Sequence, residues 1–186
     1  MPLLRKRSSI PAILAITAVL AGCGSSSSSG VAPSAYVRAV CTAVGPFEKD
    51  VVTRSSALNL TTINNPAQGK TALQGFLKAV ASDTTQALSK LKAGGTPDVK
   101  NGKGIASAIT GAFSKLNTTM TQAVKQADSL PTNDATAFKS GAQRLGNSVR
   151  SSMSNIGTNL QSNTLKSPAL EQAAAKESAC KSLGSG

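Results

Sequence analysis

The sequence predicts an all-α protein, an up-and-down bundle of four longer helices followed by a short C-terminal helix. Apolar residues recur at spacings of three and four over most of residues 34–186, without the sustained alternation that marks half-buried strands. Glycine and proline pairs divide this pattern into segments, and the short connections between them favour antiparallel neighbours. Leu, Ile, Val and Phe make up only about a fifth of the chain, close to the lower limit for a folded domain, so alanine must supply much of the core.

The first helix is expected to begin at Ser34, whose hydroxyl can cap the free N–H groups of the first turn. Gly45-Pro46 lies inside this segment. Because proline lacks an N–H group and clashes with the carbonyl group four residues earlier, we expect a kink there or a break into two pieces. The inward stripe of this helix consists of Val37, Val40, Val44, Phe47 and Val51.

The second helix has clear start and stop signals. Asn65 offers an N-cap, Pro66 suits the first helical position, and Gln68 occupies the capping-box position. Gly94-Gly95 is expected to end the helix. Its inward stripe consists of Leu73, Leu77, Val80, Thr84, Ala87, Leu88 and Leu91.

The third helix is expected to begin between Pro97 and Ile105 and to end at Leu130-Pro131. Its inward stripe consists of Ile109, Phe113, Leu116, Met120, Ala123 and Ala127. Stripes of this kind are typical of a packed core rather than of a face that holds a cofactor, and no cofactor is expected.

The fourth helix is expected after Thr132 or Asn133, and the last helix is expected to begin at Ser167-Pro168 and to continue through Cys180 to Leu183. The inward stripe of the fourth consists of Phe138, Ala142, Leu145, Val149, Met153, Ile156 and Leu160. Several glycines fall inside predicted helices, where they either permit a close approach of a neighbour or reflect composition alone. These glycines are Gly75, Gly111, Gly141, Gly146 and Gly157.

Residues 1–22 have the pattern of a secretory signal peptide. Arg5, Lys6 and Arg7 are followed by the apolar run Ile10 to Leu20, which is too short to span a bilayer as a helix. Leu20-Ala21-Gly22-Cys23 resembles the lipobox of bacterial lipoproteins. The resemblance implies that Cys23 is diacylglycerylated on sulfur and becomes the mature N-terminus; a transmembrane helix and an ordinary cleaved signal are the alternatives.

The lipobox resemblance implies a three-part organisation and a location. Residues 23–33 would be a lipidated cysteine and a flexible tether rich in Ser and Gly, and residues 34–186 the helical bundle domain. Two acyl chains would hold the tether stably on a membrane. The expected location is therefore extracytoplasmic, lipid-anchored to the bacterial cell membrane.

Two cysteines remain once Cys23 is assigned to lipidation. Disulfides persist in exported domains, so Cys41 and Cys180 are predicted to form a disulfide that ties the two ends of the bundle together. Two free buried thiols, or a redox or metal role, are the alternatives. The wide separation of the two residues in the sequence argues against a redox centre of the CxxC type.

Composition excludes much chemistry. The chain contains no histidine, which removes Ser-His-Asp and Cys-His nucleophile pairs and any histidine-containing zinc site. The carboxylates are assigned structural roles, because Glu48 and Asp50 diverge on one helix and the others fall near helix ends or polar faces. These others are Asp83, Asp98, Asp128, Asp134, Glu171 and Glu177. The sequence therefore predicts neither an enzyme nor a metal site.

The net charge of +12 is spread along the chain rather than clustered. A solvated surface is one interpretation, and attraction to an anionic lipid or a cell-wall polymer is the other. Nucleic acid is not an expected partner, since few aromatic residues are present to stack on bases. The dispersed cations include Lys70, Lys78, Lys90, Lys92, Lys100, Lys103, Lys115, Lys125, Lys139, Arg144 and Arg150.

The overall pattern resembles small helical lipoproteins of unassigned function in high-GC Gram-positive bacteria, with one cysteine near each end of the mature domain. The predicted function is a membrane-anchored, non-enzymatic surface lipoprotein that binds an envelope protein or another envelope component, such as an anionic polymer. The alternative is a carrier that holds a lipid or other apolar ligand within the helical bundle. An enzyme acting on envelope polymers would require two carboxylates that converge in a pocket.

Overall fold

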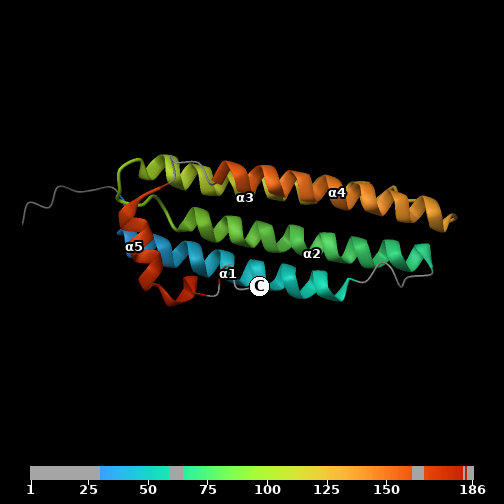
Figure 1. Ribbon diagram of the computed structural model, residues 1–186, viewed down its shortest axis with the longest axis horizontal. Helices are drawn as coiled ribbons and strands as arrows, with labels where there is room; N and C mark the ends of the chain where they lie inside the picture. The colour runs from blue at the N-terminus through green and yellow to red at the C-terminus, as the bar shows by residue number, and fades with distance from the viewer. Residues whose placement is uncertain (1–29, 59–64, 161–165, 182, 184–186) are drawn as a thin grey trace, which may run out of the picture.

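The helices of this protein account for nearly all of the residues that the structure describes. The computed structural model describes residues 30–58, 65–160, 166–181 and 183, so the predicted lipobox cysteine, Cys23, lies outside the described residues. Figure 1 shows the helices, which are α1 (Pro33–Ala57), α2 (Pro66–Ala93), α3 (Gly102–Asp128), α4 (Ala135–Leu160), α5 (Pro168–Lys176) and the short 3-10 helix η2 (Ser178–Cys180). The predicted all-α bundle of four longer helices and a short C-terminal one is confirmed.

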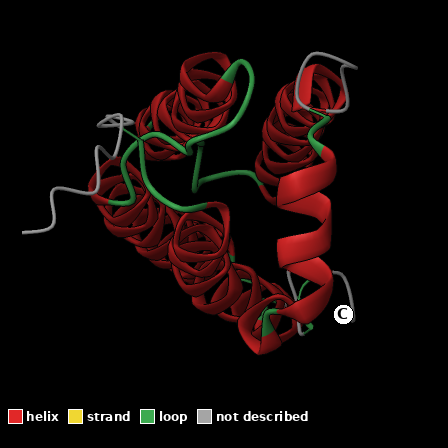
Figure 2. Ribbon diagram, turned by 90° about the vertical axis from the view of Figure 1, so that its left-hand side faces the viewer, coloured by secondary structure: helices red, strands yellow, loops and turns green. Residues whose placement is uncertain are grey.

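The four long helices lie side by side along the length of the molecule (Figure 1). Packing is most extensive between α2 and α3, followed by α1 with α2 and α3 with α4, so each long helix packs mainly on its neighbours in sequence. Helix α5 crosses the long helices near one end and packs on α1, together with η2 (Figures 1 and 2). Helices α5 and η2 therefore form a C-terminal strap across one end of the bundle.

The larger core cluster is built from residues of α2, α3 and α4. Its buried members are the residues Leu73, Leu77, Val80, Leu116, Met120, Ala123, Ala127 and Leu145. Phe47 and Val51 of α1 pack against this cluster, and the Phe47 ring meets Phe113 of α3 edge-on at a centroid distance of 5.6 Å. Small side chains at Ala123 and Ala127 bring α3 close to its neighbours, as the alanine-rich composition implied.

A second cluster lies at the end of the bundle that α5 covers. Tyr36 of α1 packs there on Ile105 and Ala106 of α3, and Leu170 of α5 closes over them. Tyr36 is only 3% exposed, and its burial raises the pKa of its phenol above the usual value of 10.0. The predicted stripe of the first helix omitted Tyr36, although the structure makes it one of the most buried residues of α1.

Helix α1 differs from its prediction at its start and is continuous through its middle. The helix begins at Pro33 with Ala32 as N-cap and without a side-chain cap, so the predicted cap at Ser34 is wrong. Proline is well suited to the first helical position, where its missing N–H would have no helical partner. Pro46 lies within one continuous helix, so the chain does not break into two helices at Gly45-Pro46.

The predicted ends of α2 are confirmed. The Asn65 side chain accepts hydrogen bonds from the N–H groups of Ala67 and Gln68. After the last turn, Gly95 adopts a φ of +74°, a conformation that glycine reaches without a steric penalty. Helix α3 begins at Gly102, within the predicted interval, and ends at Asp128, two residues before the predicted boundary.

The chain enters α1 along the connection between α2 and α3. The N–H of Val31 donates to the carbonyl of Thr96 at 2.7 Å, and the N–H of Asp98 donates to the carbonyl of Val31 at 2.8 Å. The last residues of the predicted tether are therefore held against the bundle. They mark the end of the molecule at which the membrane anchor would attach.

Helix α4 begins later than predicted. The sequence predicts the start of the helix after Thr132 or Asn133, and Asp134 provides the cap, because its Oδ1 accepts hydrogen bonds from the N–H groups of Thr136 and Ala137. Phe138 and Leu145 are buried as predicted, whereas Met153 is 43% exposed. Ala142, Val149 and Ile156 of the predicted stripe pack against the larger core cluster, so Met153 is its exposed exception.

The last helix is shorter than predicted. Helix α5 ends at Lys176, and Glu177 adopts an extended conformation before the single turn of η2. The Glu177 side chain caps that turn by accepting from the N–H of Ala179 at 3.3 Å. The change of direction at Glu177 brings Cys180 against α1, where it bonds to Cys41.

Candidate functional site

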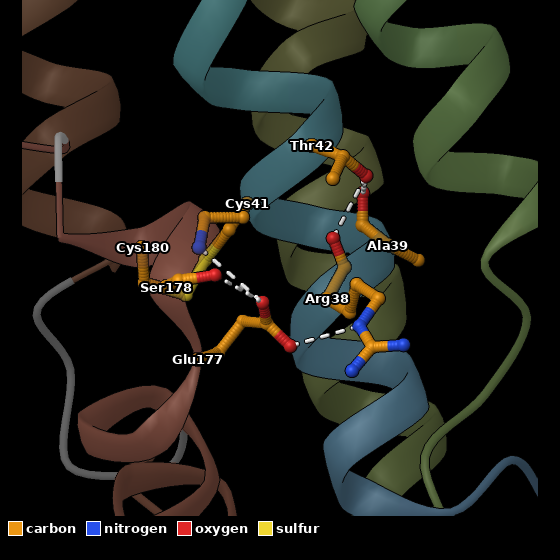
Figure 3. Close-up of polar contacts among 8 residues, drawn as sticks. Arg38, Ala39, Cys41, Thr42, Glu177, Ser178 and Cys180 are labelled. Carbon is orange, nitrogen blue, oxygen red and sulfur yellow. Dashed lines mark hydrogen bonds and ion pairs between the residues drawn. A yellow bond between two sulfur atoms is a disulfide. The ribbon is translucent and has the colours of Figure 1, made fainter.

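Cys41 and Cys180 form a disulfide between α1 and η2 (Figure 3). Their Cα atoms lie 5.1 Å apart although the residues are separated by 139 positions in the sequence. Cys41 is buried. The bond fastens the C-terminal strap to the first helix.

An ion pair lies beside the disulfide. The Nε of Arg38 donates to the Oε2 of Glu177 at 2.9 Å, and the two side chains face each other across the gap between α1 and η2 (Figure 3). The hydrogen bond from Arg38, followed by the one from the backbone N–H of Ala179, lowers the pKa of Glu177 below 4.5. Because Arg38 is largely exposed, this pair orients the strap more than it stabilises the fold.

Two carboxylates converge between α1 and α2, contrary to the prediction that Asp83 would lie on a solvated polar face. The Asp83 side chain is only 20% exposed, and its Oδ2 has no hydrogen-bond partner. Burial, and then the nearby charge of Asp50, raise the pKa of Asp83 above 3.8. The prediction failed because it considered the two residues on separate helices, and only the packing of α1 on α2 brings them together.

A guanidinium group occupies the space next to this pair. The Nη2 of Arg54 donates to Asp50 at 2.9 Å, and its Nε lies 3.7 Å from the Oδ2 of Asp83. A cavity of about 360 Å³ adjoins the two carboxylates and is also lined by Phe47, Lys49 and Lys90. With three cations around two carboxylates, the arrangement favours an ion-pair network between α1 and α2 over a pair of free catalytic acids.

An open groove, called here the α3–α4 groove, lies between the C-terminal end of α3 and the N-terminal half of α4. Its volume is about 910 Å³. Leu130, Pro131 and Leu145 contribute apolar surface to it. Its polar lining consists of two cations and four neutral side chains, which are Lys125, Gln126, Ser129, Ser140, Arg144 and Ser148.

The turn after α3, which lines part of the α3–α4 groove, is held by contacts with α2 and α4. Lys70 of α2 donates through its Nζ to the carbonyl of Asp128 at 2.7 Å and to the carbonyl of Leu130 at 3.1 Å. A Cβ atom at Gly141 would lie 2.6 Å from Cδ2 of Leu130, so glycine permits this leucine to rest directly on α4. Gly141 is therefore a helix glycine with a packing role, whereas Gly75, Gly111 and Gly146 have open space at the corresponding position.

The carboxylates of the connecting turn do not line the groove. The Oδ1 of Asp128 accepts from the Nε2 of Gln74 at 2.7 Å, and Asp134 caps α4. Lys125 and Arg144, which belong to different helices and appeared dispersed in the sequence, thus face a groove whose lining contains no acidic side chain. The geometry gives this groove a positive electrostatic potential.

Spacing along α4 is the signal that sequence reasoning missed. Ala137, Gly141, Arg144 and Ser148 recur at intervals of four, three and four, which places them on one face of the helix. That face lies beside the predicted inward stripe, so its cation, Arg144, lies at the edge of the core. The pairing with Lys125 could not be read from the sequence, because it depends on how α3 and α4 are packed.

Neither a metal site nor a membrane-spanning helix is found among the described residues. No three His, Cys, Asp or Glu side chains gather there as ligands for a metal ion. Within the same ranges, no helix combines the length and the apolar character needed to cross a membrane.

Comparison of the chain with known protein families, with curated proteins and with solved structures finds no match.

Proposed function

We propose that this protein is an extracytoplasmic lipoprotein, anchored to the bacterial cell membrane through Cys23, whose helical bundle binds a component of the cell envelope without catalysing a reaction. The observation that carries the proposal is the disulfide between Cys41 and Cys180. Disulfides of this kind persist in oxidising compartments outside the cytoplasm. The bond also accounts for two of the three cysteines, which leaves the cysteine of Leu20-Ala21-Gly22-Cys23 for acylation.

The position of the α3–α4 groove supports a role in binding at a distance from the anchor. The chain enters the bundle beside Thr96 and Asp98, whereas the groove lies at the opposite end of the long helices. Helix α1 has 25 residues and so measures roughly 38 Å. An anchor at Cys23 would therefore leave the groove free to project into the space beyond the membrane surface.

The arrangement of charged side chains supports a binding role rather than an enzymatic one. The two converging carboxylates, Asp50 and Asp83, lie beside the guanidinium group of Arg54. The absence of histidine from the sequence removes the commonest general base. The α3–α4 groove, which is open to solvent, contains cations and hydroxyl groups, which suit recognition of a ligand.

The membrane anchor is tested by intact mass spectrometry of the protein extracted from membranes. We expect a chain that starts at Cys23, carries a diacylglyceryl mass and contains one disulfide. A Cys23→Ser variant should lack the lipid and leave the membrane fraction, whereas a Ser25→Ala variant in the tether should behave as the wild type. A full-length or unlipidated chain with free thiols would overturn the proposed anchor and location.

The binding role is tested by crosslinking in intact cells and by native mass spectrometry. We expect an envelope component to be captured by the anchored protein and lost when residues 34–186 are deleted. A lipid that copurifies in stoichiometric amounts within the folded bundle would instead support the carrier alternative. The absence of any crosslinked or copurified component would contradict both roles.

A further inference from the structure

The α3–α4 groove combines two kinds of hydrogen-bond donor that suit an anion. Arg144 presents a planar fork that matches the oxygens of a phosphate or carboxylate group, and Lys125 adds a second positive charge from the facing helix. The hydroxyl groups of Ser140 and Ser148 are neutral donors along the same lining, whereas the Ser129 hydroxyl donates to the carbonyl of Lys125. A ligand with several oxygens on each charged group can use both kinds of donor.

The shape of the groove suits a chain rather than a single small ion. Its lining on α4 extends from Ala137 to Ser148, which corresponds to roughly 17 Å along the helix axis. The volume of about 910 Å³ also exceeds the space that one phosphate group requires. Because the groove is open to solvent, a polymer segment can lie along it.

The groove is also prepared before a ligand arrives. Lys70 holds the carbonyl groups at the end of α3, and Leu130 rests on Gly141, so the connecting turn has a defined position. The two acidic side chains beside that turn accept hydrogen bonds elsewhere, Asp128 from Gln74 and Asp134 from the N–H of Thr136. A preorganised lining reduces the entropy lost on binding.

We propose that the α3–α4 groove binds a phosphate-bearing anionic polymer of the cell envelope, with Arg144 and Lys125 as the two charged contacts. This inference rests on the proposed binding function and names the ligand class. The location of the groove at the end away from Val31 favours a polymer beyond the membrane over the headgroups of the anchoring membrane. Phosphate groups repeat along such a polymer, so one chain satisfies both cations at once.

The experiment measures binding of long-chain polyphosphate to the protein purified from membranes in a neutral detergent, at low and high salt. We expect binding that weakens as salt increases, because charges on both partners are screened. A Lys125→Gln/Arg144→Gln variant should bind roughly tenfold or more weakly. A matched Lys139→Gln/Arg150→Gln variant removes the same charge from exposed positions of α4 outside the groove and should bind within about twofold of the wild type.

Three outcomes would overturn the inference. Wild-type protein that does not bind polyphosphate would contradict it directly, and an equal loss of binding in both double variants would show that only net charge matters. Inorganic phosphate and soluble dihexanoyl phosphatidylglycerol serve as separate probes. If the phospholipid bound as tightly as polyphosphate and depended on Lys125 and Arg144, a lipid headgroup would replace the polymer as the ligand. Thermal melts of each variant, followed by circular dichroism, show that the bundle is folded.

The inference and the proposed function fail in different ways. A lipidated protein that captures an envelope component but does not bind polyphosphate would refute the groove assignment alone. An unlipidated protein whose polyphosphate binding depends on Lys125 and Arg144 would refute the anchor alone.

Discussion

Cys41 and Cys180 are joined by a disulfide whose ring encloses most of the helical bundle, since 139 positions separate the two residues. Closing a loop of this length limits the conformations of the unfolded chain, and the chain-entropy treatment gives about 5 kcal/mol as an upper bound for the stabilisation. A domain of this size is typically stable by only about 5–15 kcal/mol. The disulfide is therefore comparable with a large part of the total stability.

A Cys41→Ser/Cys180→Ser variant is expected to be less stable to urea by as much as about 5 kcal/mol. The loss should be accompanied by release of the strap, because α5 and η2 pack mainly on α1. Limited proteolysis should then cut first within the strap, near residues 168–180. Equal urea midpoints for the wild type in the presence and absence of reductant would contradict this expectation.

Substitution of Leu77 by alanine tests the larger core cluster. Leu77 is 3% exposed and packs in the cluster formed by α2, α3 and α4, so Leu77→Ala should reduce the free energy of unfolding by about 2–5 kcal/mol. Val52 is 44% exposed and serves as the control, since Val52→Ala should change stability by about 0.5 kcal/mol or less. Urea denaturation of the two variants measures the difference, and equal losses would place the core elsewhere.

Asp83→Asn is expected to raise the midpoint temperature of unfolding at neutral pH. The pKa of Asp83 is raised above 3.8 by burial and by Asp50, so the folded chain holds this proton more tightly than the unfolded chain. The stabilisation from protonated Asp83 is fully present below the pKa that this carboxyl has in the unfolded chain. It is lost as pH rises through the higher pKa of the folded chain. The gain from asparagine should therefore be largest at neutral pH and should shrink toward pH 4.

Thermal melts of the Asp83→Asn variant and of the wild type, followed by circular dichroism over the same pH series, measure this difference. If Asp83→Asn lowered the midpoint temperature at neutral pH, the ion pair with Arg54 would outweigh the burial of the carboxylate.

Glu177→Gln is expected to have the opposite pH dependence. The pKa of Glu177 is lowered below 4.5 by Arg38 and by the N–H of Ala179, so its stabilising effect is present above that value and is lost as pH falls through the folded pKa. The variant should melt below the wild type at neutral pH and match it in acid. Arg38→Gln removes the same hydrogen bond and should weaken the same pH dependence; an unchanged profile in both variants would exclude the pair as its cause.

Local signals predicted the helices because their causes are local. Asn65 followed by Pro66 and Gln68 places a cap, a fixed φ and a helix former in order, and α2 begins there. The prediction of helix ends was weaker where several neighbouring residues could begin or end the helix. Asp134 caps α4, which starts at Ala135, slightly later than expected, and Glu177 turns the chain before the expected end of the last helix. These choices depend on where the adjoining turn must lie against the rest of the bundle.

The sequence by itself determined the helical class, the apolar stripes of the long helices and the pairing of Cys41 with Cys180, because periodicity and the number of cysteines carry that information. It also carries the lipobox pattern on which the predicted anchor rests. Only the tertiary structure decided which charged side chains share a site. Lys125 and Arg144 line one groove, and Asp50 lies near Asp83, because the relative rotation and offset of the helix pairs result from packing of side chains over the whole core. Such proximity of distant residues leaves no fixed spacing in the sequence.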